Sequence, residues 1–85
     1  MGTSVYSVKS PVMGIFYCTP EEGANPFVKE GDRVDGGDVV CVIESMKIFT
    51  KLRAEKPGTV KKILVENEAM VIKNHALIEV ETDVE

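Results

Sequence analysis

The sequence has little histidine and cysteine, the residues that most often bind zinc or form disulfides. It contains one histidine, His75, and two cysteines, Cys18 and Cys41, which lie far apart and form no Cys-x-x-Cys pair. A structural zinc site needs about four closely spaced ligands, so no metal site is expected. We expect two reduced thiols, with Cys41 in a buried strand and Cys18 near a loop, and therefore a reducing compartment.

The sequence also lacks an excess of positive charge and a long apolar run. Ten Lys and Arg residues stand against 14 Asp and Glu residues, which gives a formal charge of −4. This charge argues against a nucleic-acid partner, which selects for a basic face. The longest apolar run, "VVCVI", is far shorter than the roughly 20 residues of a membrane span. The N-terminus "MGTSVYSV" has neither a basic nor an apolar region of a secretion signal.

No set of residues resembles catalytic machinery. There is no Ser-His-Asp arrangement, and His75 falls in an expected turn without a recognisable partner. The carboxylates are spread along the chain, and no pair stands out as a general acid and base. The chain is therefore not expected to be an enzyme on its own.

The composition and residue pattern indicate a single all-β domain. At 44% hydrophobic and 28% charged residues the chain is ordinary for one small globular domain. Short segments rich in β-branched or aromatic residues alternate with turn signals such as "EGD", "DGGD" and "KPG". No segment has a sustained helical pattern, which favours a β-sandwich or barrel. The expected strands are residues 5–10, 39–44, 48–54, 61–66 and 76–82.

An internal repeat organises the chain. The segment "VKEGDRVDGGDVVCVIE" (28–44) aligns with "VENEAMVIKNHALIEVE" (65–81) at an offset of 37 residues. The segment "VYSVKSPVMG" (5–14) aligns more weakly with "FTKLRAEKPG" (49–58) at an offset of 44 residues.

The two offsets differ by seven, so the first repeat carries a seven-residue insertion between Gly14 and Val28. Two copies of one small unit predict a fold with pseudo-twofold symmetry. Each half is then expected to contribute strands to both of two sheets packed face to face.

The stretch "VVCVIESMKIFTKLRAE" (39–55) joins the two repeats and contains no usual turn residue. A single strand over residues 39–54 would greatly exceed the mean strand length of about 5–6 residues. The boundary between the repeats therefore predicts a hairpin with Met46 and Lys47 at its tip. Met-Lys is a poor turn sequence, and local rules are most often broken at functional sites. The alternative is a longer loop or a bulge with an ordinary solvated lysine.

The segment "ESMKI" (44–48) resembles the biotinylation motif of biotin carboxyl carrier domains. The preceding "EGDRVDGGDVVCVIE" and the later "PGTVKKILVENEAMV" resemble the rest of that family's pattern, so the resemblance covers residues 5–82. It implies a flattened β-barrel or sandwich of two four-stranded antiparallel sheets, with the modified lysine on a hairpin turn. Residues 5–82 would form the biotinyl domain, and residues 1–4 a cloning remnant or a disordered N-terminus.

The resemblance implies that biotin is attached covalently to Lys47 by a biotin protein ligase. Met46, Ile48 and Glu44 are the matching flanking residues of the motif. Because an ordinary lysine amine is almost wholly protonated at pH 7, the ligase must help to deprotonate it. The biotin would receive a carboxyl group in a biotin carboxylase subunit and deliver it in carboxyltransferase subunits. The chain itself would be a non-catalytic carrier.

The insertion resembles the protruding "thumb" of carriers from multisubunit acetyl-CoA carboxylases. Here the pattern reads "SPVMGIFYCTP" followed by "EEGANPF". The resemblance implies malonyl-CoA production for fatty-acid synthesis, in the bacterial cytoplasm or the plastid stroma. Thr19 is the candidate for a polar contact with the ureido group of biotin. The plain alternative is a Pro- and Gly-containing surface loop.

Three other functions stay open. The first is a lipoyl carrier domain of a 2-oxo acid dehydrogenase, although lipoyl lysines commonly follow aspartate rather than methionine. The second is a carrier domain of another biotin-dependent carboxylase or decarboxylase, and the third is a binding module whose Lys47 is never modified. Departures from the family pattern are Ser45, Ile48, the order of Val12 and Met13, and Glu68.

Overall fold

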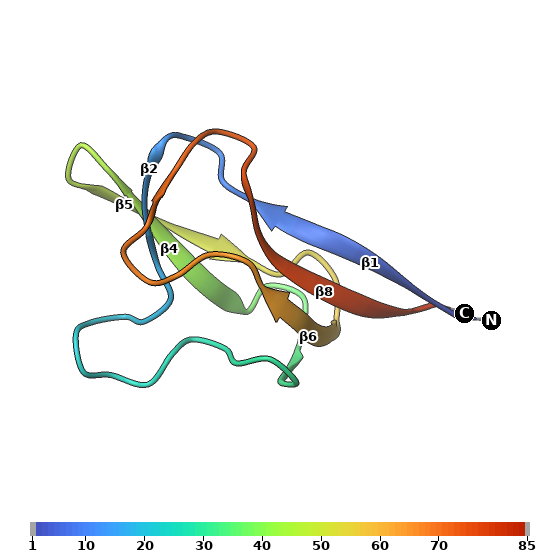
Figure 1. Cartoon of the computed structure of the whole chain (residues 1–85). Helices are drawn as coiled ribbons and strands as arrows, with labels where there is room; N and C mark the ends of the chain where they lie inside the picture. The colour runs from blue at the N-terminus through green and yellow to red at the C-terminus, as the bar shows by residue number, and fades with distance from the viewer. Residues whose placement is uncertain (1, 85) are drawn as a thin grey trace.

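The fold consists of two four-stranded antiparallel sheets (Figure 1). The structure is a computed structural model and describes residues 2–84. The eight strands are β1 (Gly2–Lys9), β2 (Gly14–Tyr17), β3 (Arg33–Val34), β4 (Val39–Ser45), β5 (Ile48–Arg53), β6 (Gly58–Ile63), β7 (Met70–Val71) and β8 (Ala76–Val84). One sheet has the order β1-β8-β6-β3 and the other the order β5-β4-β2-β7. Among the described residues there is no helix, so the predicted all-β class is confirmed.

The two repeats exchange places between the sheets. The first repeat supplies β1 and β3 to one sheet and β2 and β4 to the other. The second repeat supplies β6 and β8 to the first of these sheets and β5 and β7 to the second. Backbone geometry follows the 37-residue offset, because Gly31 (φ 95°) corresponds to Glu68 (φ 71°) and Gly37 (φ 94°) to Asn74 (φ 70°). The predicted pseudo-twofold symmetry is confirmed by these matched left-handed positions.

The hydrogen bonds outside the strands repeat in the same way. The amide of Ala54 donates to the carbonyl of Asp38 at 2.9 Å, and the amide of Ser10 donates to the carbonyl of His75 at 3.0 Å. His75 thus occupies the turn position that corresponds to Asp38, as the repeat predicts. Its amide also donates to the carbonyl of Ile72 at 3.1 Å, within the same turn.

The core lies between the two sheets and consists of the side chains that each sheet directs toward the other. In β4, Val40, Cys41 and Ile43 are buried, and in β2 Phe16 is completely buried. Phe16 is the largest of the fully buried side chains, so it is a central element of the packing. The remaining buried apolar residues are Val8, Val28, Val34, Ala54, Val60, Val71, Leu77, Ile78 and Val80.

Two expected strands differ from the structure by three residues at one or both ends. The strand expected at residues 61–66 is β6, which begins at Gly58 and ends at Ile63. Gly58 looks like a turn residue, but it lies in the sheet, where glycine is needed because a Cβ atom would collide with the carbonyl oxygen of Glu81. β1 begins at Gly2 rather than at residue 5, and residues 2–4 pair with β8. The limits 5–82 for the biotinyl domain stay a prediction.

Three strands were not expected. β3 and β7 have two residues each, which is too short for a residue pattern to reveal. β2 has four residues and lies in the segment "GIFY", directly before the insertion. These strands are specified by pairing with distant segments rather than by their own composition.

The molecule is elongated, with extents of 43 × 26 × 19 Å. The chain ends lie together at one end, where β1 and β8 pair, and the β4–β5 turn lies at the opposite end (Figure 1). Among the described residues, no helix is long and apolar enough to cross a membrane. The fold therefore holds the tip of the β4–β5 hairpin away from both termini.

The close approach of β2 and β4 predicts a steric requirement at Gly14. A Cβ atom there would collide with the carbonyl oxygen of Glu44 and with the side chain of Ile43. We expect Gly14→Ala to lower the free energy of unfolding by about 1–3 kcal/mol, measured by urea denaturation. Gly36→Ala is the matched control, since its nearest neighbour, the carbonyl oxygen of Glu55, would lie 3.4 Å away. Equal losses in the two variants would contradict this requirement.

Candidate modification site

The hairpin between β4 and β5 is closed by a two-residue turn. Ser45 pairs with Ile48, which leaves Met46 and Lys47 as the central residues. Their φ angles are 53° and 66°, so both residues lie in the left-handed region. This geometry matches the type I′ hairpin turn, which normally selects Asn and Gly. The hairpin predicted with Met46 and Lys47 at its tip is confirmed, and the longer-loop alternative is wrong.

The sheet holds this unfavourable turn in place. Left-handed backbone costs a residue with a side chain roughly 1–2 kcal/mol. Pairing of β4 with β5 continues from Ser45 back to Val39, and β4 also pairs with β2 on its other edge. Ile43, completely buried, fixes β4 to the core two residues before Ser45. The strands therefore determine the position of the turn. The identity of the two turn residues can then serve another role.

The residues at the tip face solvent. Met46 is 91% exposed, Ile48 is 67% exposed, and Lys47 is also exposed. An exposed lysine on a turn closed by paired strands presents its amine at the end of the hairpin, where another protein can reach it. Two of the predicted site residues, Met46 and Ile48, thus flank Lys47 as apolar side chains accessible from outside.

Glu44, the fourth predicted site residue of the motif, lies below the tip and is half-buried. Its carboxylate oxygen Oε1 accepts a hydrogen bond of 3.0 Å from the hydroxyl of Tyr17 in β2. The Tyr17 ring in turn lies near the Phe49 ring, with centroids 6.5 Å apart and planes tilted by 39°. Tyr17 is a site residue that sequence reasoning missed.

The surroundings of Tyr17 favour its protonated hydroxyl. The hydrogen bond to Glu44, partial burial, and the negative charges of Glu44 and Glu68 together raise the pKa of the Tyr17 phenol above its ordinary value. The hydroxyl therefore stays a hydrogen-bond donor at neutral pH, and the contact with Glu44 is a charge-assisted one.

The inserted segment is a loop that protrudes from the sheets (Figure 1). It leaves β2 after Tyr17 and returns to β3, whereas residues 64–69 make the corresponding connection in the second repeat. The loop is closed at its base, where the amide of Phe27 donates to the carbonyl of Cys18 at 2.8 Å. The amide of Cys18 donates to Oδ1 of Asn67 at 2.9 Å. The insertion is thus a defined projection with an anchored base.

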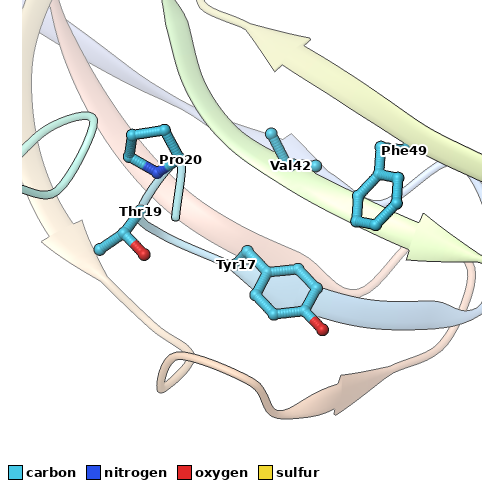
Figure 2. A pocket seen from close by; sticks show the side chains of 5 residues that line it. All are labelled: Tyr17, Thr19, Pro20, Val42 and Phe49. Atoms are coloured by element: carbon cyan, nitrogen blue, oxygen red, sulfur yellow. The ribbon is translucent and has the colours of Figure 1, made fainter. Parts of the chain in front are cut away.

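A pocket of about 230 Å³ lies where this loop meets the hairpin. Its lining residues are Tyr17, Thr19, Pro20, Val42 and Phe49. Figure 2 shows Thr19 and Pro20 on one side, Phe49 on the other, and Val42 and Tyr17 between them. The structure thus brings Thr19 beside the hairpin strands, while Met46, Lys47 and Ile48 do not line this pocket. A contact between Thr19 and a bound group stays a prediction.

The cysteines are free thiols, as expected. Cys41 is completely buried, and Cys18 is half-buried where the inserted loop begins. Burial, with a smaller contribution from Cys18, raises the pKa of the Cys41 thiol to about 12. Among residues 2–84 no group of three or more His, Cys, Asp or Glu side chains has the arrangement of a metal site.

Comparison with known protein families identifies the group. The family model described as "Biotin-requiring enzyme", for biotin and lipoyl domains, matches residues 6–80. The chain belongs to this family.

Curated relatives are carrier proteins by name. The chain is 48% identical over 60 residues to the biotin carboxyl carrier protein of acetyl-CoA carboxylase 2, chloroplastic, of Arabidopsis thaliana, covering 71% of this chain and 24% of the relative. It is 41% identical over 76 residues to the biotin carboxyl carrier protein of acetyl-CoA carboxylase of Nostoc sp., covering 89% of this chain and 42% of the relative. The chain thus spans roughly a quarter to a half of these relatives.

Solved structures share the fold. Urea carboxylase of Kluyveromyces lactis matches with a TM-score of 0.75 and 31% identity, over 91% of this chain and 6% of that one. An aspartoacylase family protein from Mesorhizobium loti matches with a TM-score of 0.73 and 26% identity, over 93% of this chain and 23% of that one. The same fold therefore occurs in proteins with different names, and the residues of the hairpin carry the functional argument.

The left-handed turn predicts a stabilising substitution. Glycine adopts positive φ without a side-chain penalty, so Met46→Gly relieves strain at the first turn position. We expect the free energy of unfolding to rise by about 0.5–1 kcal/mol, because the relieved strain of roughly 1–2 kcal/mol exceeds the entropic cost of glycine. Urea denaturation measures this change. Thr50→Gly, in the neighbouring strand β5, is the control and should be destabilising. A loss of stability in Met46→Gly equal to that of Thr50→Gly would contradict the assigned turn geometry.

The buried thiol predicts a loss of stability in alkaline solution. The pKa of Cys41 is about 12 in the folded protein, against an ordinary value of 9.0. Because folding raises this pKa, the contribution is complete below pH 9 and is lost as the pH rises toward 12. Between these values, unfolding free energy should fall more steeply in the wild type than in Cys41→Val, by at most about 1.4 kcal/mol per pH unit. Parallel pH profiles would show that this thiol is not the cause.

Proposed function

We propose that the chain is a biotin carrier domain of acetyl-CoA carboxylase, with biotin attached to Lys47. The observation that carries the proposal is the two-residue turn, which places an exposed lysine between Met46 and Ile48 on a rigid hairpin. Relatives named as biotin carboxyl carrier proteins support it over most of the chain.

The site fits an amide-linked cofactor. The ammonium of Lys47 would first lose one proton, and the neutral amine would then form a C–N bond with the acyl carbon of biotinyl-adenylate, losing a second proton while the bond to AMP breaks and AMP leaves. A biotin protein ligase supplies the adenylate and assists the deprotonation. The attached biotin would supply a nitrogen atom that accepts and releases a carboxyl group. The chain contributes placement, because strands β4 and β5 hold the lysine at the end of the molecule opposite the termini.

The proposal includes a set of partners and a role without catalysis. The carrier would meet a biotin carboxylase subunit and then carboxyltransferase subunits, so that malonyl-CoA forms for fatty-acid synthesis. A hairpin tip is reached by enzymes of different shape more easily than a cleft, because little of the scaffold surrounds it. We propose the bacterial cytoplasm or the plastid stroma as its location, in line with relatives that include chloroplastic proteins.

The rival functions differ at the tip. A lipoyl carrier would need a lipoate ligase to accept Lys47 between Met46 and Ile48, where no acidic neighbour is present. A carrier in another biotin-dependent carboxylase would use the same lysine, and the resemblance to urea carboxylase keeps that class in view. The inserted loop favours acetyl-CoA carboxylase. A binding module would leave Lys47 unmodified.

Lys47→Arg tests the site. It should abolish biotin attachment by biotin protein ligase, biotin and ATP, while stability changes by less than about 0.5 kcal/mol because the side chain is exposed. Intact mass and peptide mapping detect the attachment. Lys51→Arg, on strand β5, is the matched control and should be modified as efficiently as the wild type. Biotin on the Lys47→Arg protein would disprove the assigned site, and attachment by a lipoate ligase alone would support the lipoyl function.

Deletion of residues 19–25 tests the inserted loop. The deletion removes as many residues as the first repeat carries in excess, so the base can close as in the second repeat. We expect biotin attachment to be unchanged and carboxyl transfer in the assembled carboxylase to be slower by about tenfold, as for loss of a positioning contact. Thr19→Val should have a smaller effect in the same direction. Unchanged turnover after the deletion would argue against a functional thumb.

A further inference from the structure

Tyr17 connects the inserted loop to the hairpin that carries Lys47. It is the last residue of β2 and is followed by Cys18 and Thr19, where the loop begins. β2 pairs with β4, with Tyr17 opposite Val42, so Glu44 is the diagonal neighbour of Tyr17 on the same face of the sheet. An aromatic side chain can reach a diagonal neighbour, and the 3.0 Å hydrogen bond between Tyr17 and Glu44 uses this relation.

The same face continues onto the third strand. Phe49 in β5 is the direct pairing partner of Glu44, and its ring lies 6.5 Å from the ring of Tyr17. Glu44 lies before the turn and Phe49 after it, at equal distance from the tip. Tyr17 therefore contacts side chains on both strands of the hairpin, one through its hydroxyl and one through its ring.

The fold alone does not require this arrangement. Tyr17 points away from the core, which the neighbouring Phe16 fills, and the ring of Tyr17 is only half-buried. In the second repeat β6 has an irregularity after Val60, so Lys62 lies opposite Glu79, the counterpart of Val42, and a lysine stands where the first repeat has Tyr17. Glu81 corresponds to Glu44. Val5 corresponds to Phe49. The sheet without a lysine-bearing tip thus forms with no tyrosine or phenylalanine at these places.

We propose that Tyr17 is a positioning residue for the modification of Lys47, holding the hairpin in the orientation that the modifying enzyme binds. The inference rests on the proposed biotin-carrier function. The turn is strained and only two residues long, so small rotations of the hairpin would move the lysine relative to the enzyme. A hydrogen bond and a ring contact made before binding reduce the ordering that binding must impose.

The test measures initial rates of biotin attachment with biotin protein ligase, biotin and ATP while the concentration of the carrier varies. Tyr17→Phe keeps the ring and removes the hydroxyl. We expect its KM for the carrier to rise about fivefold, the value of one ordinary hydrogen bond, with a smaller change in kcat. Glu44→Leu, which removes the acceptor, should raise KM similarly. The double variant should be no worse than the worse single variant, because both remove one interaction.

Tyr6→Phe is the matched control. Tyr6 lies far from the tip in sequence and on the other sheet. Its hydroxyl donates to the carbonyl of Lys56 at 2.9 Å and accepts hydrogen bonds from the amides of Glu55 and Lys56. The Tyr6→Phe variant tests whether the loss of any tyrosine hydroxyl changes the rate of biotin attachment. Amide hydrogen exchange at residues 45–48 supplies a second readout, and it should become faster in Tyr17→Phe and not in Tyr6→Phe.

The outcomes separate the inference from the function on which it rests. If the wild type accepts no biotin, the proposed function fails. If the wild type accepts biotin, and Tyr17→Phe matches it in KM, kcat and exchange at the turn, the positioning role is wrong while the carrier function stands. Should Tyr17→Phe fail to fold, the KM of Glu44→Leu decides, because that variant removes the acceptor of the same bond.

Discussion

The left-handed backbone at Met46 and Lys47 is the constraint on which the rest of the site depends. Neither residue favours positive φ, yet both adopt it because β4 and β5 are paired up to Ser45 and Ile48. A turn of this kind keeps the lysine at the extreme end of a rigid ladder. An added loop residue would make the tip looser and its position less defined. Strain of this kind is expected at a site whose function depends on the position of one lysine amine.

The pseudo-twofold symmetry supplies an internal comparison. Both repeats have the same strand order, matched left-handed positions and a glycine, Gly14 or Gly58, that lets a neighbouring carbonyl approach. They differ in three features: the inserted loop, the tyrosine at its base, and the tight turn that leads from one repeat into the next. All three gather around one hairpin. The scaffold that is common to both halves accounts for the fold, and the three features without a counterpart support the proposed function.

The sequence predicts the parts of this structure that are local or repeated. The turn at Met46 and Lys47 follows from the boundary between the repeats, despite the absence of a turn residue. β3 and β7 could not be predicted, because two residues carry no periodicity. β6 was placed too late because Gly58 suggests a turn, whereas its role is the close approach of Glu81. The contact of Tyr17 with Glu44 depends on the register of β2 against β4, which no local pattern contains.

The central claim is that biotin attached to Lys47 carries a carboxyl group from one enzyme to another, and a carboxyl-transfer assay tests it most directly. The biotin-treated protein would be incubated with ATP, radiolabelled bicarbonate and biotin carboxylase, then isolated and mixed with carboxyltransferase and acetyl-CoA. The account predicts label on the carrier in the first step and in malonyl-CoA after the second, with none in either step for Lys47→Arg. Label that never reaches the biotin-loaded wild type, or that reaches the Lys47→Arg protein equally, would contradict it.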